Sequence, residues 1–153
     1  MGPDVDEGVR TMLLLMPRLV GRAKKIPIPE SLRSFSLAPR HLSLLSYLLF
    51  DGPLHVNELA TRLEVAPTTV SLMVGDLARS GILERTEDAA DRRRTIVSIA
   101  VRYRADVEGW LASGGRAWRK VLAPLTPEQR GLFIETLQAY EREVERASPE
   151  DDL

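Results

Sequence analysis

One stretch, residues 56–99, constrains the fold more than any other part of the chain. It contains two segments with helical periodicity, VNELATRL and APTTVSLMVGDLARSG, followed at once by two β-rich segments, ILERT and TIVSI. In the second helical segment, Val70, Val74 and Leu77 have the spacing of one buried helix face. The opposite face is mostly small and polar, so this helix is narrow enough to enter a groove.

Local signals delimit this helix at both ends. Pro67 suits a first helical turn, where its missing N–H has no partner to lose, and Gly81 suits a C-terminus that needs positive φ. We therefore predict a helix over Pro67–Arg79. A shorter helix is expected over roughly Asn57–Leu63, and the link Glu64–Ala66 has about the length of the turn in a helix-turn-helix.

The two β-rich segments predict an antiparallel hairpin. Thr95, Val97 and Ile99 alternate onto one face of its second strand, and residues 87–94 form an extended tip. A short strand at residues 54–56 is expected to complete the sheet. Helix, turn, helix and hairpin in this order form a winged helix-turn-helix, so the predicted fold class is mainly α with a small β-hairpin.

At these residues the sequence resembles the MarR family of bacterial transcription regulators. The tip Asp91-Arg92-Arg93 in ILERTEDAADRRRTIVSIA resembles the family's D-x-R wing, and the similarity extends to VNELATRLEVAPTTVSLMVGDLARSG and APRHLSLLSYLL. It covers roughly residues 37–99. The resemblance implies a triangular homodimer, with wings and recognition helices at two corners and the terminal helices at the apex.

Contacts with double-stranded DNA are expected from two places. The helix at Pro67 would enter the major groove, whereas its simpler interpretation is an ordinary surface helix. By resemblance, Arg93 would enter a narrow minor groove and Asp91 would hold the wing by pairing with it or with a neighbouring arginine; the simpler alternative is a solvated hairpin tip. The predicted DNA-binding residues are Arg40, Arg62, Pro67, Thr68, Thr69, Ser71, Leu72, Arg92, Arg93 and Arg94.

One position departs from the family pattern. Family members often carry a basic residue near position 76, where this chain has Asp76. A carboxylate there would repel phosphates unless it pairs with Arg79 or Arg62, so no DNA contact is predicted for it.

Long helices are expected on both sides of the winged-helix lobe, which we place at residues 37–100 of a single domain spanning 1–153. The segment 5–25 has a wide apolar stripe, with Pro17 expected to kink or interrupt it. The segment 103–147 should form two helices, the second beginning at the capping box Thr126 to Gln129. One winged-helix lobe cannot bury the apolar stripes of all these helices. We therefore predict a homodimer whose interface is formed by residues 5–25 and 103–147 of each chain.

Composition limits the function further. The net charge is −1, so a DNA-facing surface must be local, and residues 85–104 supply six arginines against three acids. The chain has no cysteine, which excludes disulfides, and the apolar run at 12–16 is too short for a membrane span; we expect a cytoplasmic protein. No catalytic or metal-binding motif is present, so neither an enzyme nor a cofactor is predicted.

A site for a small aromatic or anionic effector is a further hypothesis. Arg22 could pair with an anion, while His41, Tyr47 and Trp110 could line a wall. Ordinary structural roles explain these residues equally well. The competing functional class is a winged helix that serves as a protein-interaction module without specific DNA binding.

Overall fold

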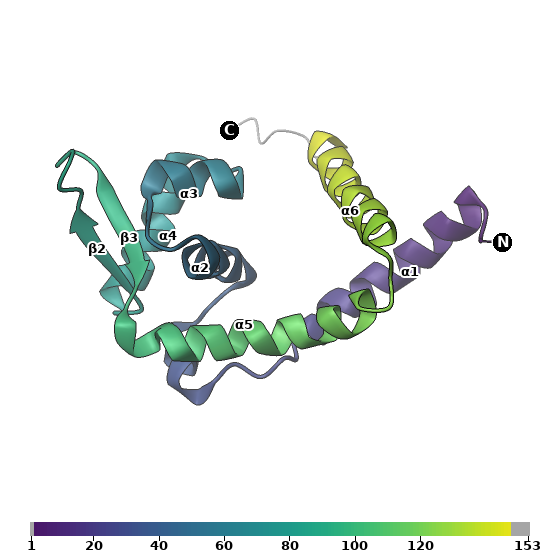
Figure 1. The fold of residues 1–153 in the computed structure, drawn as a ribbon, viewed down its shortest axis with the longest axis horizontal. Helices are drawn as coiled ribbons and strands as arrows, with labels where there is room; N and C mark the ends of the chain where they lie inside the picture. Colours follow the sequence, from purple (N-terminus) through teal and green to yellow (C-terminus); the bar gives the residue numbers. More distant parts are fainter. Residues whose placement is uncertain (1, 148–153) are drawn as a thin grey trace. The chain divides into compact units, whose positions relative to one another are not determined.

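A computed structural model describes residues 2–147 of the chain. Its elements, in chain order, are α1 (Val5–Ala23), the 3-10 helix η1 (Glu30–Phe35), α2 (Pro39–Asp51), β1 (Leu54–His55), α3 (Val56–Leu63), α4 (Pro67–Arg79), β2 (Leu83–Glu87), β3 (Thr95–Ile99), α5 (Val101–Leu122) and α6 (Pro127–Ala147) (Figure 1). The fold is mainly helical with a small antiparallel sheet, which confirms the predicted class. The chain forms two compact units that divide between Gly114 and Gly115, within α5.

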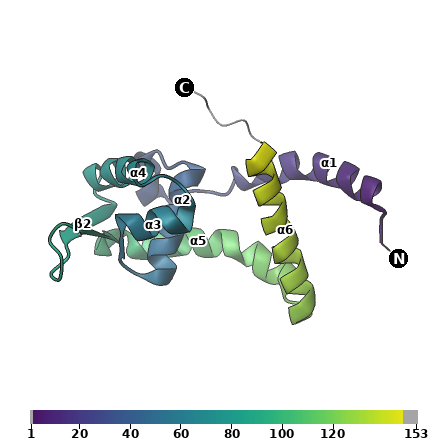
Figure 2. The ribbon, with the colours of Figure 1, turned by 90° about the horizontal axis from the view of Figure 1, so that it is seen from above.

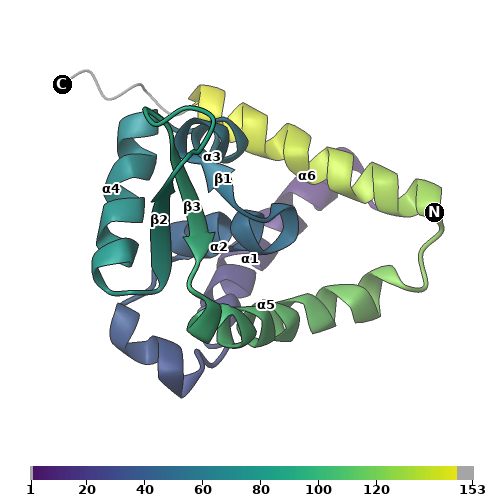
Figure 3. The same ribbon diagram turned by 60° about the vertical axis from the view of Figure 1, so that its left-hand side comes forward.

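The first unit contains the winged helix. Its sheet has the order β1-β3-β2, and the register pairs Leu54 with Val97 and Leu83 with Ile99. The helices α2, α3 and α4 gather beside this sheet (Figures 2 and 3). Buried aliphatic side chains of these helices, of the sheet and of the turn before β2 form one core, which includes Leu44, Leu45, Leu48, Leu59, Val70, Val74, Leu77, Ile82 and Val97.

The end of α4 follows the prediction from the sequence. The helix runs from Pro67 to Arg79, and Gly81 adopts a φ of 89°. The N–H of Ile82 then donates to the carbonyl of Leu77 over 3.1 Å, which satisfies a carbonyl of the last turn. This turn leads the chain directly into β2 and so fixes the hairpin beside α4.

Of the two outcomes expected at Pro17, the interruption is wrong and the kink stays a prediction. Helix α1 is continuous from Val5 to Ala23, because Pro17 removes only one intrahelical hydrogen bond and the other turns remain bonded. The helix is capped by Asp4, whose carboxylate accepts the N–H of Glu7 over 2.9 Å. None of its described residues is buried.

The second unit contains the end of α5 and all of α6. The predicted capping box is present: the N–H of Thr126 donates to Gln129 Oε1 over 2.9 Å, and the N–H of Gln129 donates to Thr126 Oγ1 over 3.2 Å. Trp118 and Phe133 pack with ring centroids 6.0 Å apart. No described residue of α6 is buried. The sequence predicts that Ser148-Pro149 ends this helix, but these two residues lie outside the described part of the chain.

None of the described helices combines the length and hydrophobicity that crossing a bilayer requires.

Candidate nucleic-acid interface

Helix α4 presents two distinct faces. Val70, Met73, Val74 and Leu77 are buried in the core of the lobe. The opposite face is exposed and consists of Thr68, Thr69, Ser71, Leu72 and Asp76, with Pro67 also exposed at the first turn. Short hydroxyl side chains beside one leucine offer hydrogen bonds and an apolar contact, which are the two ways of recognising base edges in the major groove.

The carboxylate of Asp76 is neutralised locally. Arg79, one turn further along α4, donates to it through Nη2, and both side chains are exposed. Arg62, the other predicted partner, pairs instead with Asp51 and Glu58. The pair of Asp76 with Arg79 removes a lone negative charge from the exposed face of α4, which would otherwise repel phosphates.

Two of the predicted DNA-binding residues, Arg40 and Arg62, lie outside both α4 and the wing loop and are expected to contact phosphates. Arg62 donates through Nε to Asp51 over 2.9 Å, and its Nη1 lies 3.7 Å from Glu58. A phosphate would have to compete with these two carboxylates. Arg40 is exposed at the start of α2, and its charge acts on the neighbouring His41.

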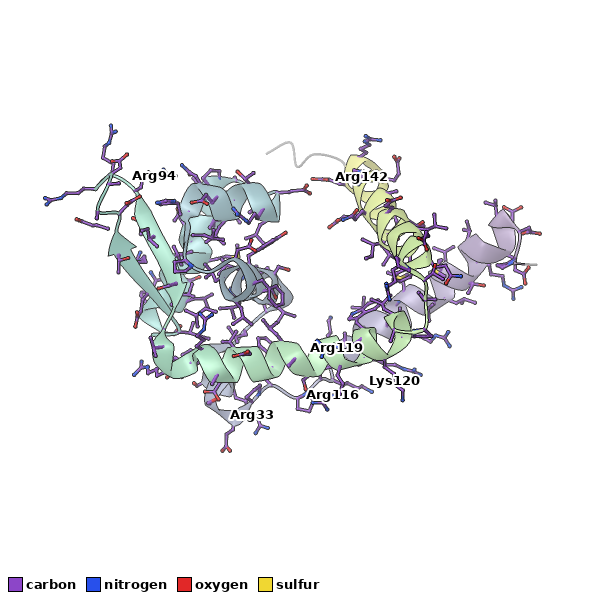
Figure 4. The ribbon with its side chains drawn as sticks, in the orientation of Figure 1. Arg33, Arg94, Arg116, Arg119, Lys120 and Arg142 are labelled. Carbon is purple, nitrogen blue, oxygen red and sulfur yellow. The ribbon has the colours of Figure 1, made fainter. Side chains whose placement is uncertain are left out.

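The loop between β2 and β3, residues 88–94, carries the three arginines of the tip. The N–H of Asp88 donates to the carbonyl of Arg94 over 3.0 Å, which closes the base of the loop. Asp91 Oδ1 accepts from Arg93 twice, from the backbone N–H at 3.1 Å and from Nε at 3.2 Å. Arg92, Arg93 and Arg94 are all exposed, and Figure 4 shows Arg94 on this loop.

A contact that sequence reasoning missed joins this loop to the rest of the lobe. His55, at the end of β1, places Nδ1 against Glu58 Oε1 and Nε2 2.7 Å from Asp88 Oδ2. The hydrogen bonds to Glu58 and Asp88 raise the pKa of His55, outweighing burial and the charge of Arg94. The contact with Glu58 could have been expected, because Glu58 follows His55 by three residues, which is the spacing of a helix capping box. No local pattern indicates the contact with Asp88, which lies 33 residues away in the sequence.

The residues proposed for an effector site have structural contacts. His41 is 7% exposed and accepts the N–H of Ala38 at Nδ1 over 2.9 Å. Burial lowers its pKa, with a further contribution from Arg40 and opposition from Asp76. Tyr47 donates to the carbonyl of Arg62 over 3.1 Å, and Trp110 packs partly buried against the core.

These contacts do not assemble the four residues into a site. Arg22 is exposed in the last turn of α1, and within residues 2–147 no hydrogen bond joins any two of the four side chains. His41 Nε2 is the one buried side-chain nitrogen or oxygen of the described residues that lacks a hydrogen-bond partner. Among the same residues, no cluster of three histidine or carboxylate side chains could hold a metal ion.

The sequence resembles those of known DNA-binding regulators. Residues 35–94 match the sequence profile of the MarR family. The HTH-type transcriptional repressor MdtR of Bacillus subtilis is 31% identical over 102 residues, which are 65% of this chain and 64% of MdtR. The match therefore spans just under two thirds of that repressor's length.

Solved structures extend the similarity over nearly the whole chain. The YusO protein of Bacillus subtilis is 28% identical with a TM-score of 0.56, and the alignment covers 95% of this chain and 98% of YusO. MepR of S. aureus, solved in a DNA-binding conformation, is 20% identical with a TM-score of 0.62, covering 86% of this chain and 98% of MepR. At that identity the likeness to MepR shows the fold alone.

Proposed function

Because the chain belongs to the MarR family of winged-helix proteins, we propose that it is a sequence-specific DNA-binding transcription regulator, acting as a homodimeric repressor. One observation carries this proposal: the exposed polar face of α4 and an exposed loop of three arginines belong to one compact lobe. The first suits the major groove and the second suits the negative potential of a minor groove.

Two such lobes related by a two-fold axis would read a pseudo-palindrome. Each α4 would enter one major groove, so the half-sites should lie about one helical turn apart, roughly 10 base pairs. The residues proposed to contact DNA are Pro67, Thr68, Thr69, Ser71 and Leu72 from α4, Arg92, Arg93 and Arg94 from the wing, and Arg40 and Arg62 as phosphate contacts.

Exposed apolar side chains support the proposed dimer. Val5, Leu13 and Leu14 of α1 and Leu132 of α6 are each more than half exposed. Apolar surface of this extent is unfavourable in water and is typical of an interaction surface. A second copy of the same helices is the simplest partner, because homo-oligomers with two-fold symmetry are the commonest assemblies.

We also propose that a small aromatic or anionic effector releases the protein from DNA. NadR, which shares the fold, was solved in complex with 4-hydroxyphenylacetate. In this chain, the buried Nε2 of His41 is a polar atom whose hydrogen-bonding capacity is unused among the described residues. An effector would release DNA only through a higher affinity for the non-binding dimer geometry. A panel of small aromatic carboxylates, added to a preformed DNA complex, tests this part.

The test of DNA recognition is a fluorescence-anisotropy titration with the duplex immediately upstream of the protein's own gene, at two salt concentrations. Tight binding that weakens with salt and survives competitor DNA is expected, because several arginines replace counterions on the phosphates. Weak binding that is equal on every sequence and insensitive to salt would favour the protein-interaction module instead.

A further inference from the structure

His55 joins three parts of the lobe. Its own position ends β1, its Nδ1 faces Glu58 Oε1 on α3, and its Nε2 lies 2.7 Å from Asp88 Oδ2 at the base of the wing. The side chains of His55 and Asp88 are only 19% and 17% exposed, so water competes weakly for their contact. We call His55, Glu58 and Asp88 the wing latch.

The two contacts of the imidazole require the same protonation state. An ionised carboxylate only accepts hydrogen bonds, so both ring nitrogens must donate. The imidazolium has two N–H groups and satisfies both partners. The neutral ring has one N–H, and its other nitrogen would direct a lone pair at a carboxylate oxygen. Loss of the proton therefore breaks one side of the latch.

Asp88 connects His55 to the backbone of the wing loop. Its Oδ1 accepts the N–H of Ala90 over 2.9 Å, and its own N–H donates to the carbonyl of Arg94 over 3.0 Å. The position of Asp88 thus sets both ends of the loop that carries Arg92 and Arg93. Within the described residues, the bond from His55 is the side-chain contact that ties this loop to β1.

We propose that protonated His55 is a positioning residue for the wing, and that loss of its proton weakens DNA binding; the inference rests on the proposed DNA-binding function. His55 makes no DNA contact in this account. It acts through Asp88, which holds the loop in the conformation that presents the arginines.

The charges around the latch favour the protonated form. Glu58 and Asp88 raise the pKa of His55, whereas burial and Arg94 lower it by less. Arg62 lies 3.7 Å from the second oxygen of Glu58, at the far side of the cluster. His55 therefore keeps its proton to a higher pH than an ordinary histidine does, because its pKa is raised above 6.5. Because coupling is reciprocal, DNA binding should in turn raise the pKa of His55.

NMR of the free protein tests the latch without DNA. The chain has two histidines, so the imidazole signals of His55 can be identified by their loss in His55→Gln. We expect His55 to titrate above His41, and the amides of Ala90 and Arg94 to shift with the same midpoint. In Asp88→Asn, the midpoint of His55 should fall. Wing amides that do not follow the titration of His55 would overturn the inference.

DNA affinity at about pH 6 and about pH 8.5 then tests the consequence. Wild-type affinity should fall by about three- to tenfold as pH rises, since a coupling of about a quarter to half a pKa unit at each of the two latches of the proposed dimer corresponds to that range. His55→Gln retains His41 and the terminal amine, so it serves as the matched control and should show little of this fall. Asp88→Asn should also flatten the profile while leaving the histidine in place.

The outcomes separate this inference from the proposed function. Equal pH dependence in the wild type and in His55→Gln, with DNA bound by both, would overturn the role of His55 alone. A wild-type protein that binds no DNA at either pH would overturn the proposed function and, with it, the inference.

Discussion

Asp91 Oδ1 accepts two hydrogen bonds from Arg93, one from the backbone N–H at 3.1 Å and one from Nε at 3.2 Å. The carboxylate therefore fixes both the backbone and the start of the guanidinium group of the same residue. The Arg93 side chain nevertheless remains 91% exposed, so the rest of the guanidinium group is free to meet a ligand. This geometry orients an arginine and leaves it accessible.

Replacing Asp91 should separate orientation from stability. An exposed ion pair contributes at most about 1 kcal/mol, so Asp91→Ala should change the free energy of unfolding by no more than about that amount. DNA affinity should fall severalfold, because Arg93 loses its fixed direction. Asp91→Asn is the matched control, since its amide oxygen can still accept the backbone N–H. Thermal unfolding and anisotropy measure the two effects, and equal DNA affinity for all three proteins would refute the orienting role.

Two leucines of α4 offer a comparison of core and surface. Leu77 is 2% exposed, and Leu77→Ala should cost about 2–5 kcal/mol of unfolding free energy through lost burial and a cavity. Leu72 is 72% exposed, and Leu72→Ala should change stability by only about 0.5 kcal/mol. If Leu72 contacts a thymine methyl group, its loss should reduce discrimination between operator and competitor DNA. Chemical denaturation and competition titrations provide the measurements; unchanged discrimination would remove Leu72 from the interface.

Two glycines should respond in opposite directions to alanine. Gly81 has a φ of 89°, and a Cβ there would lie 2.8 Å from Arg102 Nη2, so Gly81→Ala should destabilise the protein by about 1 kcal/mol or more. Gly109 lies inside α5 with no atom within 4 Å of an added Cβ. Gly109→Ala should therefore stabilise the helix by up to about 1 kcal/mol. Denaturation midpoints test both, and the same sign for both variants would contradict the assigned backbone conformations.

Much of the lobe could be predicted from local patterns. The structure confirms three of these local predictions. Helix α4 begins at Pro67, the chain turns after it at Gly81, and the alternating residues Thr95–Ile99 form a strand. Capping chemistry is equally local, which explains the correct prediction of Thr126 and Gln129. Pro17 does not interrupt α1, because it removes only one intrahelical hydrogen bond.

The arrangement of side chains from distant segments could not be predicted in the same way. His55 and Asp88 come into contact because β1 pairs with β3, which places the wing loop beside the end of β1. A periodic pattern along the sequence cannot predict such a contact between distant segments. The sequence left open whether His41 lines an effector site or has an ordinary structural role, and only the fold shows that it is buried while accepting the N–H of Ala38. The DNA-contacting roles of individual residues remain predictions.

The proposed dimer can be disrupted through its apolar surface. Leu13 is 69% exposed on α1 and Leu132 is 67% exposed on α6. Leu13→Glu and Leu132→Glu should shift sedimentation from dimer to monomer, because a charge would be buried without a partner in the interface. Phe50→Ser is the control, since Phe50 is also exposed but belongs to α2 of the lobe. Monomeric wild-type protein would show that these helices are not a dimer interface.

The wing latch should make stability depend on pH in a defined direction. The pKa of His55 is raised, so its contribution is present below the ordinary value of 6.5 and is lost as pH rises through the raised value. The pKa values of Glu58 and Asp88 are lowered, chiefly by His55 and by the N–H of Ala90 respectively, so their contributions are lost only in acid. The melting temperature of wild type should exceed that of His55→Gln between these limits and converge with it in base. A constant difference across the range would contradict the latch.

The most direct test of DNA recognition through the wing is the salt dependence of binding in the wild type and in Arg93→Ala, measured by anisotropy on one duplex. We predict a steep loss of wild-type affinity with salt. Arg93→Ala should bind more weakly, and a dimer that loses two phosphate-neutralising charges should show a slope of log K against log[salt] shallower by about 2. Identical affinity and slope in a folded Arg93→Ala protein would contradict the assignment of the wing to DNA.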